Sequence, residues 1–269
     1  MFSRPIGYKG YAVHGSFQAA KKTVKANYGN RQEFKFITAV RHPVERLISH
    51  FYHCIAVRRR TGGRQDCWSS QFKVWRTYER DDGERALRRF LLDPWSLKHV
   101  HNMHVYSILG RRELPWDTEG NLAEQAAEVL RTEFALVGNP CNMTRMYLEF
   151  CDRFKLQPND AAFTAAGIHL LRQAPSKYKV SKEMLDLIAG LNHHDLQLYN
   201  LLQQHQAECP NRFESEIEPF SMTQVKESIK SSASQVGVKW SWLGERYAPA
   251  VFGAEYMHVG PLGGTHMGC

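Results

Sequence analysis

Residues 34–54 read FKFITAVRHPVERLISHFYHC, and this stretch predicts a strand that runs directly into a helix. Its first part is a short apolar run rich in β-branched and aromatic side chains, which is typical of a strand buried on both faces. Pro43 suits the first turn of a helix, where a missing N–H costs little. Beyond it, apolar residues recur at helical spacing and predict one stripe that packs flat on the sheet: Val44, Leu47, Ile48, Phe51, Tyr52 and Ile55.

The junction between this strand and this helix has the layout of an anion site. Arg41 stands at the carboxyl end of the strand, and Ser49 lies two turns into the helix on its polar side. Anions are favoured at helix N-termini because unpaired N–H groups and the helix dipole converge there. From the residues alone, the junction is either a phosphate site or an ordinary α/β corner with a solvated arginine. The polar side carries Glu45, Arg46, Ser49, His50 and His53.

The run RHPVERLISHFYH resembles the 3′-phosphate-binding motif of the sulfotransferases that use 3′-phosphoadenosine-5′-phosphosulfate (PAPS), in the RDPxERxxSxY form of the Golgi carbohydrate enzymes. It is most similar to the family of heparan sulfate and uronyl 2-O-sulfotransferases. In that family the motif's arginine and serine hold the 3′-phosphate, and they fall here on Arg41 and Ser49. A guanidinium fork and a hydroxyl are suitable phosphate donors.

This resemblance implies a fold, a cofactor and a reaction. The expected fold is α/β, a central and mainly parallel sheet flanked by helices, like the P-loop-kinase-like fold of sulfotransferases but incomplete at the N-terminus. The expected cofactor is PAPS as sulfate donor, without a metal ion. The expected reaction is transfer of a sulfuryl group to a hydroxyl of a glycosaminoglycan-like carbohydrate.

His14 is the candidate general base. The acceptor hydroxyl must lose its proton as it attacks, and histidine accepts protons near neutral pH. The family carries a histidine in a segment reading HGH or GH before the motif, and His14 stands 27 residues before Arg41. Here the order is His-Gly-Ser, with Ser16 in place of the second histidine. The residues alone leave His14 equally as a loop histidine near a turn.

The family's 5′-phosphosulfate loop, a PKTGGTS-like segment before that histidine, has no counterpart in residues 1–9. The nearest match lies in residues 256–269, YMHVGPLGGTHMGC, where Pro261 stands at the position of the lysine. Chance in a glycine-rich tail, a permuted or tandem arrangement, and a wrongly assigned gene boundary all remain open. The missing lysine motivates an alternative function, a catalytically impaired sulfotransferase-like protein that binds polyanions or nucleotide without transfer.

Arg58, Arg60 and Arg64 belong to a basic segment, RRRTGGR at residues 58–64. It is either a solvated charge cluster or a clamp for an acidic glycan, since guanidinium groups match carboxylates and sulfates. The formal net charge of +8 favours an acidic partner. The expected partner is an acidic or sulfated polysaccharide acceptor. Nucleic acid is not expected, because no recognition motif accompanies the charge.

Further segments keep the order of the family across about residues 10–205. Residues 101–110 resemble a helical DNxxTRxLxG segment, and a helix at 121–131 feeds a strand at 134–138. Ser181 is the expected N-cap of one long helix that runs to about Gln206. The positions that match the family motifs in the first and last of these segments are Asn102, Leu109, Gly110, Asp195, Leu198 and Tyr199.

The chain is expected to hold a sulfotransferase-like domain at 1–208 and a C-terminal extension at 209–269. Its length of 269 residues suffices for a sizeable core. The 6 cysteines are widely separated and lack metal-ligand spacing, so no metal site is expected, and free thiols and disulfides both remain open.

The expected location is the Golgi lumen or membrane, and this expectation comes from the resemblance. No run of the sequence is long and apolar enough for a membrane span, so membrane association is expected only through a segment absent from this chain. The sequon Asn142-Met143-Thr144 permits N-glycosylation in a lumen, as in a glycoprotein.

Overall fold

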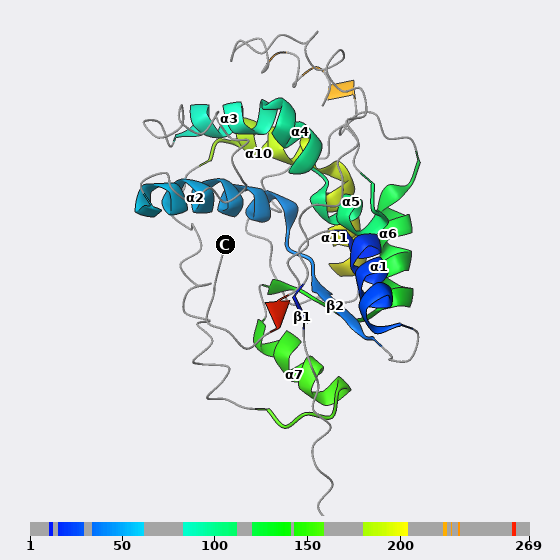
Figure 1. The fold of residues 1–269 in the computed structure, drawn as a ribbon. Coiled ribbons are helices and arrows are strands. Elements are labelled where there is room, and N and C mark those ends of the chain that lie inside the picture. The colour runs from blue at the N-terminus through cyan, green and yellow to red at the C-terminus, as the bar shows by residue number, and fades with distance from the viewer. Residues whose placement is uncertain are drawn as a thin grey trace, which may run out of the picture.

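The computed structural model describes residues 11–12, 16–29, 34–61, 83–111, 120–140, 143–158 and 180–203, with the short pieces 223–224, 227, 231 and 260–261. Figure 1 shows the arrangement of the elements. In chain order they are β1 (Tyr11–Ala12), α1 (Phe17–Tyr28), β2 (Phe36–Ala39), α2 (Pro43–Thr61), α3 (Glu84–Leu92), α4 (Pro94–His99), α5 (Met103–Leu109), α6 (Leu122–Glu133), β3 (Phe134–Gly138), α7 (Met143–Arg153), α10 (Lys182–Leu191), α11 (His193–Gln203) and β4 (Gly260–Pro261).

Strands β2 and β3 form a parallel pair, and it is the larger sheet in the described part of the chain. The register runs from Phe36 opposite Phe134 to Ala39 opposite Gly138. A parallel sheet flanked by helices is thus confirmed, in a helix-rich structure with two strands in this sheet. The prediction that the first strand is buried on both faces was wrong, because Ile37 is 45% exposed. Ile37 points to the opposite face from its neighbours in the strand.

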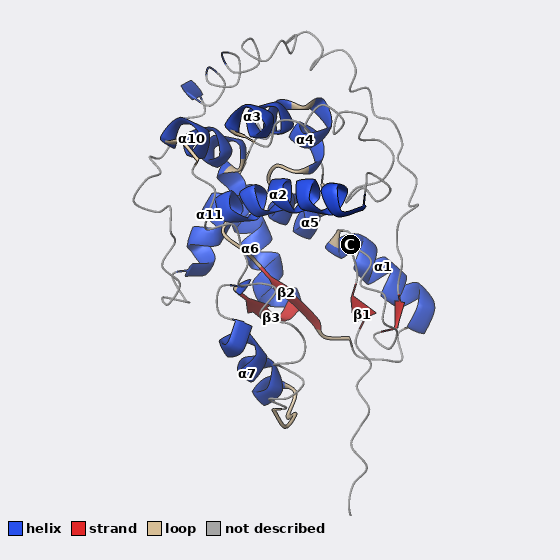
Figure 2. Ribbon diagram, turned by 90° about the vertical axis from the view of Figure 1, so that its left-hand side faces the viewer, coloured by secondary structure: helices blue, strands red, loops and turns tan. Residues whose placement is uncertain are grey.

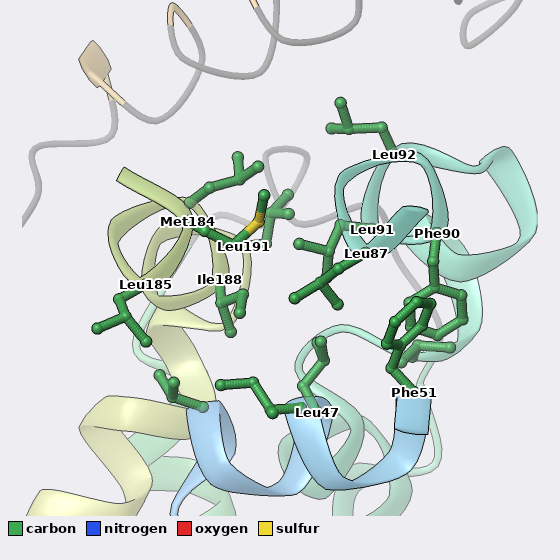
Figure 3. Packing of buried hydrophobic residues seen from close by; sticks show 14 of the residues in the cluster. Leu47, Phe51, Leu87, Phe90, Leu91, Leu92, Met184, Leu185, Ile188 and Leu191 are labelled. Atoms are coloured by element: carbon green, nitrogen blue, oxygen red, sulfur yellow. The ribbon is translucent and has the colours of Figure 1, made fainter. Parts of the chain in front are cut away.

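Helix α2 packs its apolar stripe against other helices, so the prediction that the stripe lies flat on the sheet was wrong. The stripe itself is confirmed, since all six of its predicted residues are buried. Figure 3 shows Leu47 and Phe51 facing side chains from α3 and α10. The local sequence pattern of α2 does not predict these partners, because they lie farther along the chain: Leu87, Phe90, Leu91, Met184 and Ile188.

A second buried cluster joins α5, α6 and α11, and Val40, directly after β2, belongs to it. Figures 1 and 2 show α7 on the opposite side of the β2–β3 pair from α3, α4 and α10. Val40 is only 3% exposed, whereas the side chain of the next residue, Arg41, is 30% exposed. The chain therefore leaves an apolar interior at Val40 and reaches the surface at Arg41.

Helix α10 begins at the predicted position. Ser181 is its N-cap, and the Ser181 hydroxyl accepts a hydrogen bond from the amide of Met184 at 3.2 Å. Glu84 at the start of α3 contacts both the amide and the hydroxyl of Ser181. The cap satisfies an N–H group that has no partner within the helix. This part of the sequence prediction is confirmed.

The single long helix predicted after Ser181 is in fact two helices, which meet at Asn192. The side chain of Asn192 donates to the carbonyl of Ile188 at 2.8 Å and accepts from the amide of Asn102 at 3.1 Å. The second contact joins residues 90 positions apart, so no apolar periodicity can reveal it. The break turns the chain into α11, which packs on α5 and α6.

Strands β1 and β4 form a separate antiparallel pair with Tyr11 opposite Pro261. This pairing brings a residue near the end of the chain beside one near its beginning. The two residues of β4 belong to the segment that resembles the family's glycine-rich loop, and the neighbouring residues of that segment lie outside the described part.

Substitution of Gly138 by alanine is expected to destabilise the protein by about 1–3 kcal/mol. Gly138 ends β3, and a methyl group there would overlap Sδ and Cγ of Met146 on α7. Urea denaturation measures the change in unfolding free energy. In a Met146→Ala background the same substitution should cost much less, and an equal cost in both backgrounds would contradict this steric explanation.

Candidate functional site

The carboxyl ends of β2 and β3 form one edge of the parallel pair, and polar residues follow both strands there. The amide of Val40 donates to the carbonyl of Gly138 at 2.9 Å, so the pairing extends to the end of both strands. Arg41 and His42 come next on one strand, and Asn139 comes next on the other. In α/β sheets the carboxyl edge is where ligands bind.

Arg41, Glu45 and Ser49 are spaced by four residues and therefore share one side of α2 and its approach. The Arg41 Nε atom lies 3.7 Å from Glu45 Oε2, and the two side chains are 30% and 28% exposed. Ser49 is partly exposed one turn farther along. The hydrogen-bond ladder of α2 begins with the amide of Arg46, which donates to the carbonyl of His42 at 2.9 Å. A guanidinium, a hydroxyl and the start of a 19-residue helix thus lie on one side.

His42 stands where the family motif has aspartate, and it is buried beneath this edge. His42 is only 3% exposed. Its ring packs edge-on against the ring of Tyr199, with 5.0 Å between the ring centroids. Asn139 donates to the hydroxyl of Tyr199 at 3.1 Å. Burial, with the neighbouring Arg41 charge, lowers the pKa of His42 to about 4. His42 is therefore neutral near pH 7 and adds no charge to the edge.

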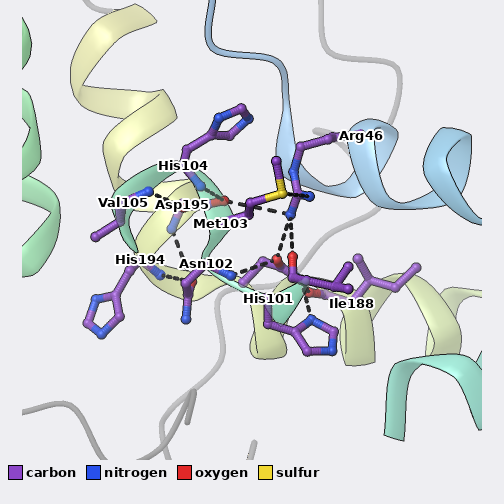
Figure 4. A network of polar contacts seen from close by, with 11 residues as sticks. Arg46, His101, Asn102, Met103, His104, Val105, Ile188, His194 and Asp195 are labelled. Atoms are coloured by element: carbon purple, nitrogen blue, oxygen red, sulfur yellow. Dashed lines mark hydrogen bonds and ion pairs between the residues drawn. The ribbon is translucent and has the colours of Figure 1, made fainter. Parts of the chain in front are cut away.

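Asn102 and Asp195 cap each other's helices, as Figure 4 shows. Asn102 Oδ1 accepts hydrogen bonds from the amides of His194 at 3.1 Å and Asp195 at 3.3 Å, at the start of α11. In return, the Asp195 carboxylate accepts from the amides of His104 at 3.1 Å and Val105 at 2.9 Å, at the start of α5. Both capping residues are fully buried. The positions that match two separate family motifs therefore meet in the interior.

Arg46 joins this network from α2. Its Nη2 atom donates to the carbonyl of Val100 at 2.9 Å and to Asn192 Oδ1 at 3.2 Å, and it lies 3.7 Å from Asp195 Oδ2. The Arg46 side chain is only 11% exposed, although the sequence places it on the polar side of α2 with Ser49. Arg46 therefore ties α2 to α5 and α11.

The same network fixes the protonation of His101. The Asn192 amide nitrogen donates to His101 Nδ1 at 3.2 Å, so the Nε2 atom carries the proton and donates to the carbonyl of Leu91 at 2.9 Å. Burial lowers the pKa of His101 to about 4, opposed by these hydrogen bonds. His101 therefore has a structural role.

The predicted site residues are placed to different degrees. Ser49 lies in α2, and Arg41 precedes this helix on the same side. Arg58 and Arg60 lie in the last turns of α2, and their side chains are outside the described part. His14 and Arg64 also fall outside the described residues. The structure adds His42, Asn139 and Tyr199 at the sheet edge. For Asn139 the only available signal was its position directly after a strand.

Within the described residues, no group of three or more potential metal ligands comes together. The helices in that part also include none with the length and apolar character required to cross a membrane. Cys151 is a buried free thiol.

Comparison with known proteins gives one match. The sequence profile of the sulfotransferase family matches residues 11–201, more than two thirds of the chain. The chain belongs to the sulfotransferase family. Searches of curated proteins and of solved structures found no match. The part matched to the sulfotransferase family includes Arg41, Ser49 and the whole Arg46–Asn102–Asp195 network, and it ends before β4.

Proposed function

We propose that this sulfotransferase uses PAPS as donor and a hydroxyl of a glycosaminoglycan-like carbohydrate as acceptor. The observation that supports PAPS is the placement of Arg41 at the carboxyl end of β2, next to the start of α2 and on the same side as Ser49. The resemblance to the 3′-phosphate motif assigns the phosphate to these two residues.

The residues at this edge fit a phosphate group. The 30% exposure of the Arg41 side chain leaves it accessible to a ligand. Its five N–H donors exceed what one carboxylate takes up, and the contact of Nε with Glu45 at 3.7 Å is long for a hydrogen bond. A phosphate can therefore take two parallel hydrogen bonds from the guanidinium group. The Ser49 hydroxyl would add a neutral donor.

Bound PAPS would supply the activated sulfuryl group. In this proposal Arg41 and Ser49 hold the 3′-phosphate and so fix the position of the nucleotide. His14 accepts the proton of the acceptor hydroxyl, for which its neutral imidazole is suited. The proposal for His14 rests on its sequence context.

Arg58, Arg60 and Arg64 are proposed to contact the acidic groups of the acceptor. Arg58 and Arg60 lie on the same helix as Ser49, nearer its C-terminal end. The formal net charge of +8 adds a general attraction for a polyanion. We place the reaction in the Golgi lumen, where such acceptors are modified, and this placement rests on the family resemblance and the sequon at Asn142.

Arg41→Ala is expected to weaken the binding of adenosine 3′,5′-bisphosphate about 10- to 100-fold, because it removes a charge-assisted contact to the 3′-phosphate. Binding of adenosine 5′-monophosphate should change less than about threefold. Calorimetry on both ligands measures the difference. Arg131→Ala is the matched control, since Arg131 is an exposed arginine that pairs with Glu128 on α6. Equal binding by wild type and Arg41→Ala, or no binding by either, would exclude the site.

The alternative is a sulfotransferase-like protein that binds nucleotide or polyanions without transfer. Pro261, which stands in place of the family's lysine, pairs with Tyr11 in the β1–β4 sheet and cannot supply a positive charge there. This alternative predicts heparin retention that falls steeply with salt and no transfer of labelled sulfate from PAPS. Transfer to a heparan-type acceptor would exclude it.

A further inference from the structure

The Asp195 carboxylate lies between the two elements that hold Arg41. On one side it accepts hydrogen bonds from the first amides of α5, at His104 and Val105. On the other side it faces the Arg46 guanidinium, at 3.7 Å. Asp195 has no exposed surface, so this charge acts in a low-dielectric interior.

The two groups that contact Asp195, the start of α5 and the Arg46 side chain, are both close to Arg41. The His104 ring lies close to the backbone of Arg41, and Figure 4 shows this ring pointing toward the segment that leads into α2. The His104 Nε2 atom is buried without a hydrogen-bond partner in the described part. Arg46 is five residues beyond Arg41 and fixes the first turn of α2 against Val100. The backbone of Arg41 is therefore held from α5 and from α2.

We propose that Asp195, together with Arg46, is a positioning residue for the phosphate-binding arginine. The buried pair sets where Arg41 leaves β2, and so where its guanidinium meets the 3′-phosphate. Arg41 is itself exposed on the surface side, with only Glu45 as an ion-pair partner among the described residues. The position of the Arg41 guanidinium group then depends on where the Arg41 backbone is held. This inference rests on the proposed function, because it assigns the network to the same nucleotide site.

The test keeps the net charge constant. Asp195→Asn alone would remove a negative charge near the site and leave the charge of Arg46 uncompensated. This would strengthen phosphate binding and oppose the weaker binding expected from a displaced Arg41. The double variant R46Q/D195N removes both charges and leaves an amide nitrogen facing one of the two N–H groups that Asp195 accepts from at the start of α5. The matched control is R88Q/E183Q, which removes an ion pair of 2.9 Å between α3 and α10.

The measured quantity is the ratio of affinities for adenosine 3′,5′-bisphosphate and adenosine 5′-monophosphate. R46Q/D195N should lower this ratio about tenfold, since a displaced guanidinium loses most of a charge-assisted contact. The control should leave it within about twofold. In an Arg41→Ala background, R46Q/D195N should have no further effect on the ratio, and a merely structural role would not produce that dependence.

Circular dichroism establishes that each variant is folded before binding is measured. If R46Q/D195N does not fold, His104→Gln takes its place, because it removes the ring contact with Arg41 and leaves the caps of α5 intact; a fall of about threefold is expected. An unchanged ratio in a folded variant, or an equal fall in the Arg41→Ala background, overturns the inference. A wild-type protein that does not distinguish the two nucleotides overturns the proposed function instead.

Discussion

The folded protein is expected to lose stability steeply as the pH falls from 6.5 to 4. Four histidines in the described part of the chain have their pKa lowered from 6.5 to about 4, chiefly by burial: His42, His101, His104 and His193. Between pH 6.5 and 4 the histidines of the unfolded chain bind protons, whereas these histidines stay neutral in the folded state. Unfolding therefore becomes more favourable as the pH falls. Each histidine lowers the free energy of unfolding by up to about 3 kcal/mol, and the full loss is reached only below pH 4.

Nearby charges act in both directions on these groups. Arg41 lowers the pKa of His42 further, and Arg46 does so for His101 and His104, whereas Asp195 opposes the shift of His104. Urea denaturation at pH 7.5, 6.0 and 5.0 measures the slope of the unfolding free energy against pH. His104→Gln should reduce it by about 1.4 kcal/mol per pH unit, the contribution of one proton. Equal stability of the wild type at the highest and lowest of these pH values would contradict the prediction.

Replacement of His14 by alanine is expected to lower the rate of sulfuryl transfer about 10²- to 10⁴-fold, the usual contribution of a general base. The affinity for adenosine 3′,5′-bisphosphate should stay unchanged, because binding of the 3′-phosphate is assigned to Arg41 and Ser49. Transfer of labelled sulfate to a heparan-type acceptor measures the rate, and calorimetry measures the affinity.

Ser16→Ala is the control for His14, since it alters the same segment without removing a proton acceptor. Ser16 caps α1 by accepting from the amide of Ala19 at 3.2 Å. Its loss should cost about 1 kcal/mol of stability with little change in rate. If the His14→Ala protein kept a rate within about threefold of wild type, the base would have to be another residue.

Local features of the fold could be predicted from the sequence because neighbouring residues determine them. Pro43 at the start of α2 and the Ser181 cap are set by backbone chemistry at single positions. The helix before β3 follows from the apolar spacing within it, and the strand at 134–138 has its predicted bounds. The position of Arg41 at a strand end follows from the same kind of pattern.

The burial of Arg46 and the pairing of Asn102 with Asp195 could not be predicted in this way. Asn102 contacts amides 92 and 93 positions away, and Arg46 contacts Asn192, 146 positions away, distances in the chain that no periodicity records. A weak signal existed, because Asn102 and Asp195 are polar positions that both matched family motifs. Buried polar groups need partners, so two such positions in apolar surroundings could have been paired with each other.

The mutual capping of α5 and α11 also affects the order of events during synthesis. Helix α5 has only 7 residues, and the carboxylate that caps it is 90 residues farther along the chain than Val105. At ribosomal speeds this interval lasts about 5–20 s. Until Asp195 emerges, α5 lacks the carboxylate that caps its start, and Arg46 lacks its contact with Asp195. Under the proposed function, the nascent chain therefore carries its phosphate-binding arginine long before the contacts proposed to position it can form.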